Sequence, residues 1–203
     1  VLRQLLAVER RLADAGVVTN YRPSSEKPYA TTLASQFRRM GYRTRFFYGG
    51  YLTWQKIGDF MKAQAFEEIY GGGHITTESA ARTEWGVEDD ALLAFVTDTV
   101  ARDRDRPSFN MIMTTSYHPP YDLDVRNRGF TLKEIPSDFK ELYDGTTTLN
   151  MLGHLWYSDQ CIGSFVRKTE KQIPRALFAF TGDHFSRKFL NIRPDAYEGA
   201  AVP

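Results

Sequence analysis

Asp183 and His184 are adjacent in the sequence and combine a carboxylate with an imidazole. Both groups ligate divalent metals, and mixed oxygen and nitrogen ligation suits manganese or zinc better than calcium. The pair follows Gly182 and the apolar stretch 176–181, which has the composition of a buried strand. The alternative is that Asp183 caps a turn and His184 lies on the surface. The pattern therefore indicates a candidate metal site at the end of a strand.

His118 precedes Pro119 and Pro120, so it lies in a stiff loop. Such a loop can hold an imidazole toward a substrate oxyanion. A protonated imidazole would stabilise developing phosphate charge, and a neutral one would donate or accept a hydrogen bond. The alternative is an ordinary solvated loop histidine.

Trp54 and Lys56 follow the pair Gly49-Gly50, at the expected start of a helix. Backbone amides at a helix start favour anions, and Lys56 would add a positive charge there. The indole of Trp54 could pack against the carbon skeleton of a substrate. The alternative is that Trp54 belongs to the core, because it shares a helical face with Ile57 and Met61.

Elements that would position these residues alternate along the chain. We expect helices at 1–15, 29–40, 53–65, 88–102 and 147–171, strands at 43–48, 108–115 and 176–181, and long loops at 20–28 and 116–144. Strands separated by helices predict a largely parallel sheet with both faces covered. Ligands bind at the carboxyl ends of such strands, so the polar groups after the three strands should converge on one edge.

The composition of the chain excludes several classes of protein and site. Lys plus Arg number 26 and Asp plus Glu number 25, so the net charge is 26 − 25 = +1, which argues against a nucleic-acid surface. Aromatic residues make up 14% of the 203 residues, enough to fill a core and also to line the walls of a binding cleft. Cys161 is the single cysteine, which excludes an internal disulfide and a cysteine-based zinc site. No apolar run reaches the roughly 18 residues of a membrane span.

The 147–171 helix carries further polar residues. His154 and Asp159 lie off its apolar stripe, so we expect both to be solvated. Cys161 is expected to be a small, partly buried residue without a nucleophilic role.

Five motifs in order resemble the lipoteichoic acid synthase-like sulfatase family of the alkaline phosphatase superfamily, and its Gram-negative phosphoglycerol-transferase-like members most of all. They are FFYGGYLTW (46–54), TEWGVEDDAL (83–92), FNMIMTTSYHPPY (109–121), LWYSDQCIGSF (155–165) and ALFAFTGDHFSRKF (176–189). The resemblance implies a three-layer α/β/α sandwich with a mostly parallel central sheet. It also implies a metal-dependent phosphotransferase or phosphodiesterase that forms a covalent threonine intermediate.

Site residues follow from the same resemblance. Asp183 and His184 would ligate one divalent metal, manganese before magnesium or zinc. His118 would be catalytic and contact the substrate phosphate, and Trp54 and Lys56 would bind substrate. The pair Gln55-Lys56 departs from the pairs usual in the family, which bears on the role of Lys56. The implied substrate is a lipid- or glycan-linked phosphodiester and not a nucleic acid.

The threonine nucleophile and an upstream metal-binding glutamate find no match within the chain. We therefore expect residues 1–203 to be a partial catalytic domain, inactive alone, of a longer membrane-anchored protein. The domain would lie on the outer, periplasmic or extracellular, face of the cytoplasmic membrane. Two alternatives stay open: an inactive family member that binds anionic lipid as a regulatory module, and, more weakly, a sulfate-ester hydrolase. Cys161 is in the wrong place to be a sulfatase nucleophile.

Overall fold

The computed structural model describes residues 29, 31–76, 82–137 and 146–183. It divides the chain into two compact units, Val1–Thr115 and Ser116–Pro203. The expected helix at 1–15, the expected loop at 20–28 and His184 lie outside the described residues. In the described part, no helix combines the length and the apolar character that crossing a membrane requires.

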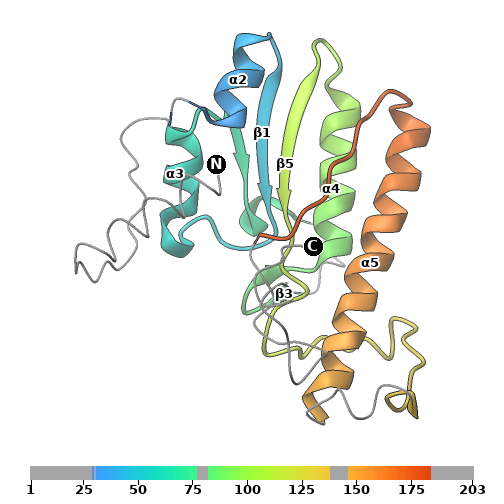
Figure 1. Cartoon of the computed structure of the whole chain (residues 1–203). Coiled ribbons are helices and arrows are strands. Elements are labelled where there is room, and N and C mark those ends of the chain that lie inside the picture. Colours follow the sequence, from blue (N-terminus) through green and yellow to red (C-terminus); the bar gives the residue numbers. More distant parts are fainter. Residues whose placement is uncertain (1–28, 30, 77–81, 138–145, 184–203) are drawn as a thin grey trace. The chain divides into compact units, whose positions relative to one another are not determined.

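A parallel sheet with strand order β2-β1-β5 forms the centre of the first unit (Figure 1). β1 (Arg43–Tyr48) pairs with β2 (Glu68–Tyr70) on one side and with β5 (Ser108–Met113) on the other. The strands expected at 43–48 and 108–115 are confirmed. The three-residue β2 was not predicted, because it is too short to show a period-two pattern.

Helices cover both faces of this sheet, as the α/β prediction requires (Figure 1). α2 (Leu33–Arg39) and α3 (Ile57–Ala63) pack on one face, and α4 (Asp89–Arg102) packs on the other. Side chains of β1 alternate accordingly: Phe46 joins the core beneath α2 and α3, while Phe47 contacts Phe95 of α4. Burial of the Phe46 and Phe47 rings contributes about 1.5–3 kcal/mol each to the free energy of unfolding.

Helix boundaries follow local chemistry. α2 begins after Thr32, whose hydroxyl accepts the Ser35 amide at 3.2 Å, and Gly41 follows it with φ of +84°. The helix expected at 53–65 is instead broken in two. A 3-10 turn, η1 (Trp54–Lys56), precedes α3, because Gln55 and Lys56 both adopt left-handed backbone angles.

Two small elements follow β2. The 3-10 turn η2 (Gly72–His74) places His74 on the surface, with its Nδ1 bonded by the Gly71 amide at 3.1 Å. β3 (Arg82–Thr83) and β4 (Gly86–Val87) then form a two-stranded antiparallel ribbon before α4.

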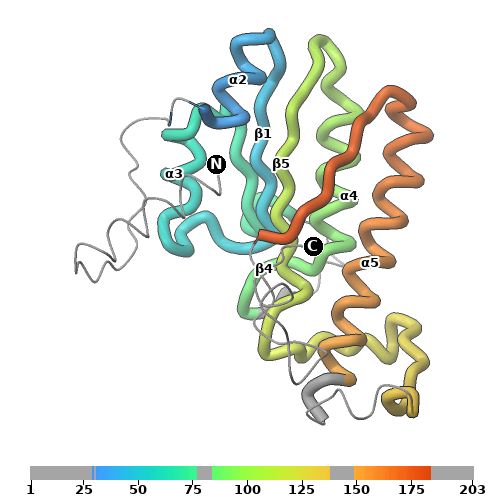
Figure 2. Tube along the Cα trace, viewed as in Figure 1, coloured from blue at the N-terminus to red at the C-terminus, as the bar shows by residue number. Residues whose placement is uncertain are grey.

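The described residues of the second unit form a long irregular segment, 116–137, α5 (Thr146–Gln172) and a further irregular segment, 173–183 (Figure 2). Val125 and Phe130 of the segment pack with Tyr157 of α5 to form a small core. Gly153 allows this approach, because a Cβ there would lie 2.6 Å from Val125 Cγ2. The helix predicted at 147–171 is confirmed. The prediction that His154 is solvated is wrong, since only 2% of it is exposed.

The strand predicted at 176–181 is absent from the described structure. Leu177 is 96% exposed and Phe180 is 61% exposed, and Phe178 contacts Phe165 of α5 edge-on. A strand requires a ladder of hydrogen bonds to a neighbour, and this segment pairs with no described strand. Its apolar composition correctly indicated strand propensity but supplied no pairing partner.

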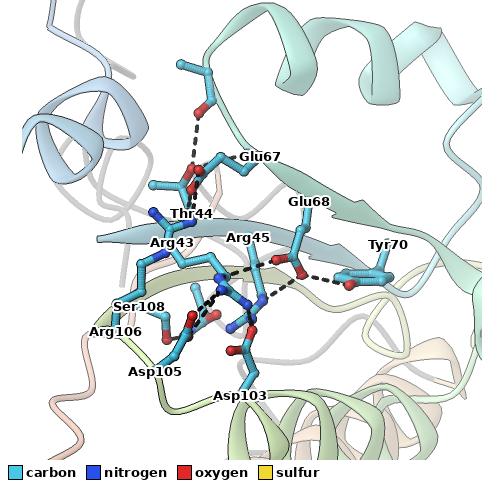
Figure 3. Close-up of polar contacts among 12 residues, drawn as sticks. Arg43, Thr44, Arg45, Glu67, Glu68, Tyr70, Asp103, Asp105, Arg106 and Ser108 are labelled. Atoms are coloured by element: carbon cyan, nitrogen blue, oxygen red, sulfur yellow. Dashed lines mark hydrogen bonds and ion pairs between the residues drawn. The ribbon is translucent and has the colours of Figure 1, made fainter. Parts of the chain in front are cut away.

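Arg45 is buried in the middle of the sheet, with 1% of its side chain exposed (Figure 3). Its Nε donates to Glu68 at 2.8 Å, and its Nη2 donates to Asp103 at the end of α4. Arg43 shares Asp103 and also donates to Asp105 at 2.9 Å. A buried guanidinium is tolerated only when such partners compensate its desolvation, so the cluster fixes β1 against β2 and α4.

Glu68 is held ionised by this cluster. Burial opposes ionisation, but hydrogen bonds from Arg45 and Tyr70 and the positive charges of Arg45 and Arg43 outweigh it and lower the pKa of Glu68. A lowered pKa in the folded state gives stability that is present above the unfolded value and lost as pH falls through the folded one.

We therefore predict that Glu68→Gln lowers the free energy of unfolding by about 1.5–3 kcal/mol at pH 7. The difference from wild type should shrink below the unfolded value of about 4.5. Urea denaturation followed by circular dichroism between pH 3 and pH 7 measures it. The exposed Glu170→Gln is the control and should change stability by less than about 0.5 kcal/mol at every pH. A Glu68 effect that does not vary with pH would contradict the assignment.

Candidate functional site

The carboxyl edge of the sheet is held together by backbone groups of glycine. β1 is followed by Gly49, whose amide donates to Met113 of β5 at 3.0 Å and whose carbonyl accepts from Val87 at 2.9 Å. The Gly50 carbonyl accepts from Gly72 at 2.8 Å. The ends of β1 and β5 and the segments before α4 and after β2 thus meet around two residues.

Side chains would not fit at this junction. A Cβ on Gly86, which has φ of +134°, would lie 2.1 Å from the Gly49 carbonyl oxygen. A Cβ on Gly72 would lie 2.6 Å from the same oxygen, and one on Gly49 would lie 2.8 Å from Thr115 Oγ1. The glycines are therefore required by close backbone approach.

Asp89 is a residue of this edge to which the sequence interpretation gave no role. Its carboxylate is fully buried in the first turn of α4 and accepts the Thr115 amide at 3.0 Å. The Thr115 hydroxyl donates to the Val87 carbonyl at 3.1 Å. Together these bonds fix the start of the segment that leads to His118. An acidic residue at a helix start was visible in the sequence, but its burial was not.

Trp54 and Lys56 lie together on the turn η1. Trp54 is 40% exposed and its ring centroid is 6.3 Å from that of Tyr48, so it extends the core to the surface. Lys56 is exposed and borders a shallow hollow of about 510 Å³. The hollow is also lined by Leu52, Thr53, Gly58, Asp59, Lys62 and Ile69. The turn can therefore offer an indole face and an ammonium group to a ligand.

His118 lies on the surface of the second unit, and its Nδ1 is 2.7 Å from the Pro119 carbonyl oxygen. Tyr117 and Tyr121 precede and follow it in the sequence, and their ring centroids are 5.8 Å apart. Burial raises the pKa of the Tyr117 hydroxyl, and burial followed by the neighbouring Tyr117 raises the pKa of Tyr121. Both phenols therefore remain protonated at neutral pH and can donate hydrogen bonds.

Asp183 is exposed at the end of the segment 176–182, and its neighbour His184 lies outside the described residues. Within the described ranges, no group of three or more metal-ligating side chains comes together. A carboxylate followed in the sequence by an imidazole has the donor types that manganese, magnesium or zinc accept. The metal site and the convergence of all three polar clusters stay predictions, whereas the ends of β1 and β5 do lie side by side.

A parallel sheet covered on both faces, with polar groups at the carboxyl edge, defines an α/β protein of the kind that binds ligands at that edge. The chain belongs to the sulfatase family, whose model matches residues 2–198. It is thus a member of an enzyme superfamily, and the resemblance drawn from its five motifs is confirmed.

Two solved structures have a similar fold. The lipoteichoic acid synthase LtaP from Listeria monocytogenes is 18% identical, with a TM-score of 0.64 over 77% of this chain and 36% of LtaP. A protein of the alkaline phosphatase superfamily from Vibrio parahaemolyticus is 26% identical, with a TM-score of 0.54 over 75% of this chain and 34% of that protein. The chain therefore spans about a third of the length of these structures.

The glycine junction yields a direct test. Gly86→Ala should lower the free energy of unfolding by about 2–4 kcal/mol, because it adds both backbone strain and overlap with the Gly49 carbonyl. Gly73→Ala is the matched control, since a Cβ there meets nothing within 4 Å, and it should change stability by less than about 0.5 kcal/mol. Thermal and urea denaturation of both variants measure the difference. Equal stability of the two would show that the junction is not closely packed.

Proposed function

We propose that this chain is part of the catalytic domain of a metal-dependent phosphotransferase or phosphodiesterase of the phosphoglycerol transferase type. The substrate would be a lipid- or glycan-linked phosphodiester, and the reaction would pass through a covalent threonine intermediate. The observation that carries the proposal is the sulfatase match over residues 2–198, combined with polar groups placed directly after β1 and β5. The domain would act on the outer face of the cytoplasmic membrane as part of a membrane-anchored protein.

Asp183 and His184 would hold the metal, manganese before magnesium or zinc. When bound, such an ion lowers the pKa of a nucleophile and neutralises charge on phosphoryl oxygens. The exposed carboxylate of Asp183 is compatible with this role, and further ligands would have to complete the coordination.

The chain's own groups would bind and orient the phosphodiester. His118 would stabilise charge on the phosphate, helped by the hydroxyl groups of Tyr117 and Tyr121, which stay protonated. Lys56 would add a cation, and Trp54 would pack against the carbon skeleton next to the phosphate. Preorganised groups of this kind usually supply the largest part of the electrostatic stabilisation in a transition state.

Metal binding tests the assignment of Asp183. Loss of a residue that only supports a metal ligand lowers metal affinity by roughly 10–100-fold. Asp183→Ala removes a ligand itself, so isothermal titration should show a larger loss of Mn²⁺ affinity. Asp159→Ala, at an exposed position of α5, is the matched control and should bind like wild type. Unchanged affinity in Asp183→Ala, with circular dichroism showing an intact fold, would contradict the metal site.

Turnover separates the enzyme from its alternatives. The protein that contains this chain should hydrolyse a chromogenic phosphodiester when Mn²⁺ is added, and His118→Ala should lower that rate by about 10²–10⁴-fold. Hydrolysis of a chromogenic sulfate ester in its place would identify a sulfate-ester hydrolase. Metal binding without any turnover, together with binding to anionic vesicles, would support the regulatory lipid-binding module.

A further inference from the structure

His154 is a buried histidine that joins α5 to the segment carrying His118. It is 2% exposed, and both of its ring nitrogens are bonded. Nε2 is 3.0 Å from the Leu123 amide nitrogen, and Nδ1 is 2.8 Å from the Asn150 carbonyl oxygen one turn earlier on α5. The side chain therefore bridges its own helix and the irregular segment.

These two partners define the protonation state of the ring. A carbonyl oxygen only accepts, so Nδ1 must carry a hydrogen, and an amide only donates, so Nε2 must have none. His154 is thus a neutral imidazole in the Nδ1-H form. Adding a proton to Nε2 would place two donors against each other and abolish the bond to Leu123.

The aromatic contacts of His154 lead directly to the candidate site. Its ring packs edge-on against that of Tyr121, with 5.4 Å between the ring centroids. The ring centroids of Tyr121 and Tyr117 are 5.8 Å apart. His118 sits between these two tyrosines in the sequence. The His154 imidazole therefore holds this stretch against α5 by one hydrogen bond, from the Leu123 amide, and one ring contact, with Tyr121.

A second attachment of the segment does not titrate. Val125 and Phe130 pack against α5 beside Gly153 and contact Tyr157 through apolar surface. The Leu123 side chain packs at the edge of this attachment, which should survive protonation of His154. Loss of the bond to the Leu123 amide would therefore loosen residues 117–122, which include His118, and leave the segment from the Leu123 side chain onward in place.

We propose that His154 is a positioning residue whose neutral imidazole fixes the segment carrying His118, and whose protonation releases that segment. The link to catalysis rests on the role of His118 in the proposed function, whereas the release itself does not. The site would then be ordered at neutral pH and loosened in acid.

The ionisable surroundings of His154 are compatible with this behaviour. The Tyr121 phenol faces the ring from the segment, with Tyr117 behind it. Asp122 and Asp124, on either side of Leu123, are exposed, and Asp124 bonds Asn127. Further along, Arg126 lies over the Phe130 ring and Arg128 over Tyr157.

Hydrogen exchange of single amides on the intact chain tests the proposal. After correction for intrinsic exchange, protection of the Leu123 amide should fall by at least about tenfold between pH 8 and pH 5, as expected for release linked to one proton. The Phe130 amide, bonded to Val125 at 3.0 Å, is the internal control and should keep its protection. In nitrogen-15 spectra at pH 8, His154 should show the Nδ1-H form.

Two variants separate release from simple destabilisation. His154→Gln can still accept the Leu123 amide but cannot gain a proton, so protection of Leu123 should become independent of pH. His154→Leu removes the acceptor, so protection should be low at every pH. Wild-type protection that does not change with pH, or an Nε2-H form at pH 8, would overturn the proposal even if neither variant folds.

Activity then addresses the proposed function separately. If the protein hydrolyses a phosphodiester, His154→Gln should lose less rate than wild type on going from pH 8 to pH 5. An identical acid profile would overturn the regulatory role of His154. Absence of any turnover would overturn the proposed function while the exchange data still decide whether His154 controls the segment.

Discussion

The close meeting of backbones at Gly49 and Gly50 is the constraint on which the candidate site depends. Their carbonyl oxygens accept amides from Val87 and Gly72, two segments far apart in sequence. At these distances even a methyl group would overlap with a carbonyl oxygen. These contacts fix the backbone at the ends of β1 and β5. The turn η1, which follows β1, and Thr115, which follows β5, therefore cannot shift independently of each other.

The opposite end of β1 is fixed by charge. Arg43 and Arg45 are neutralised by Glu68 and by two carboxylates at the end of α4 (Figure 3). This cluster orders the sheet at a distance from the polar edge, so we interpret it as structural. A structural cluster at one end of the strands and polar groups at the other are typical of α/β proteins, in which ligands bind at the carboxyl ends of the strands.

Much of the fold could be predicted from the sequence because its signals are local. The strands at 43–48 and 108–115 and the helices α4 and α5 show clear patterns of apolar residues. The break at Gln55 and Lys56 could not be predicted, because neither residue type favours left-handed angles. The strand expected at 176–181 failed for a different reason: pairing depends on a neighbour that composition does not reveal.

Site residues divide in the same way. The structure places Trp54 and Lys56 on the turn after β1 and His118 on the loop after β5, as their order in the sequence predicted, and their roles stay predictions. The burial of Asp89 and His154 depends on tertiary contacts, with Thr115 and with Leu123, that a helical stripe does not report. A polar residue off the stripe of a long helix is solvated only if no other segment covers it there.

We propose that Asp183 and His184 hold a catalytic metal in this sulfatase-family domain. The most direct test is a crystal structure of the protein grown with Mn²⁺, with diffraction recorded at the manganese absorption edge. We predict an anomalous peak bonded to the Asp183 carboxylate and the His184 imidazole. A peak bound elsewhere, or a fully ordered pair with no metal beside it, would contradict the account.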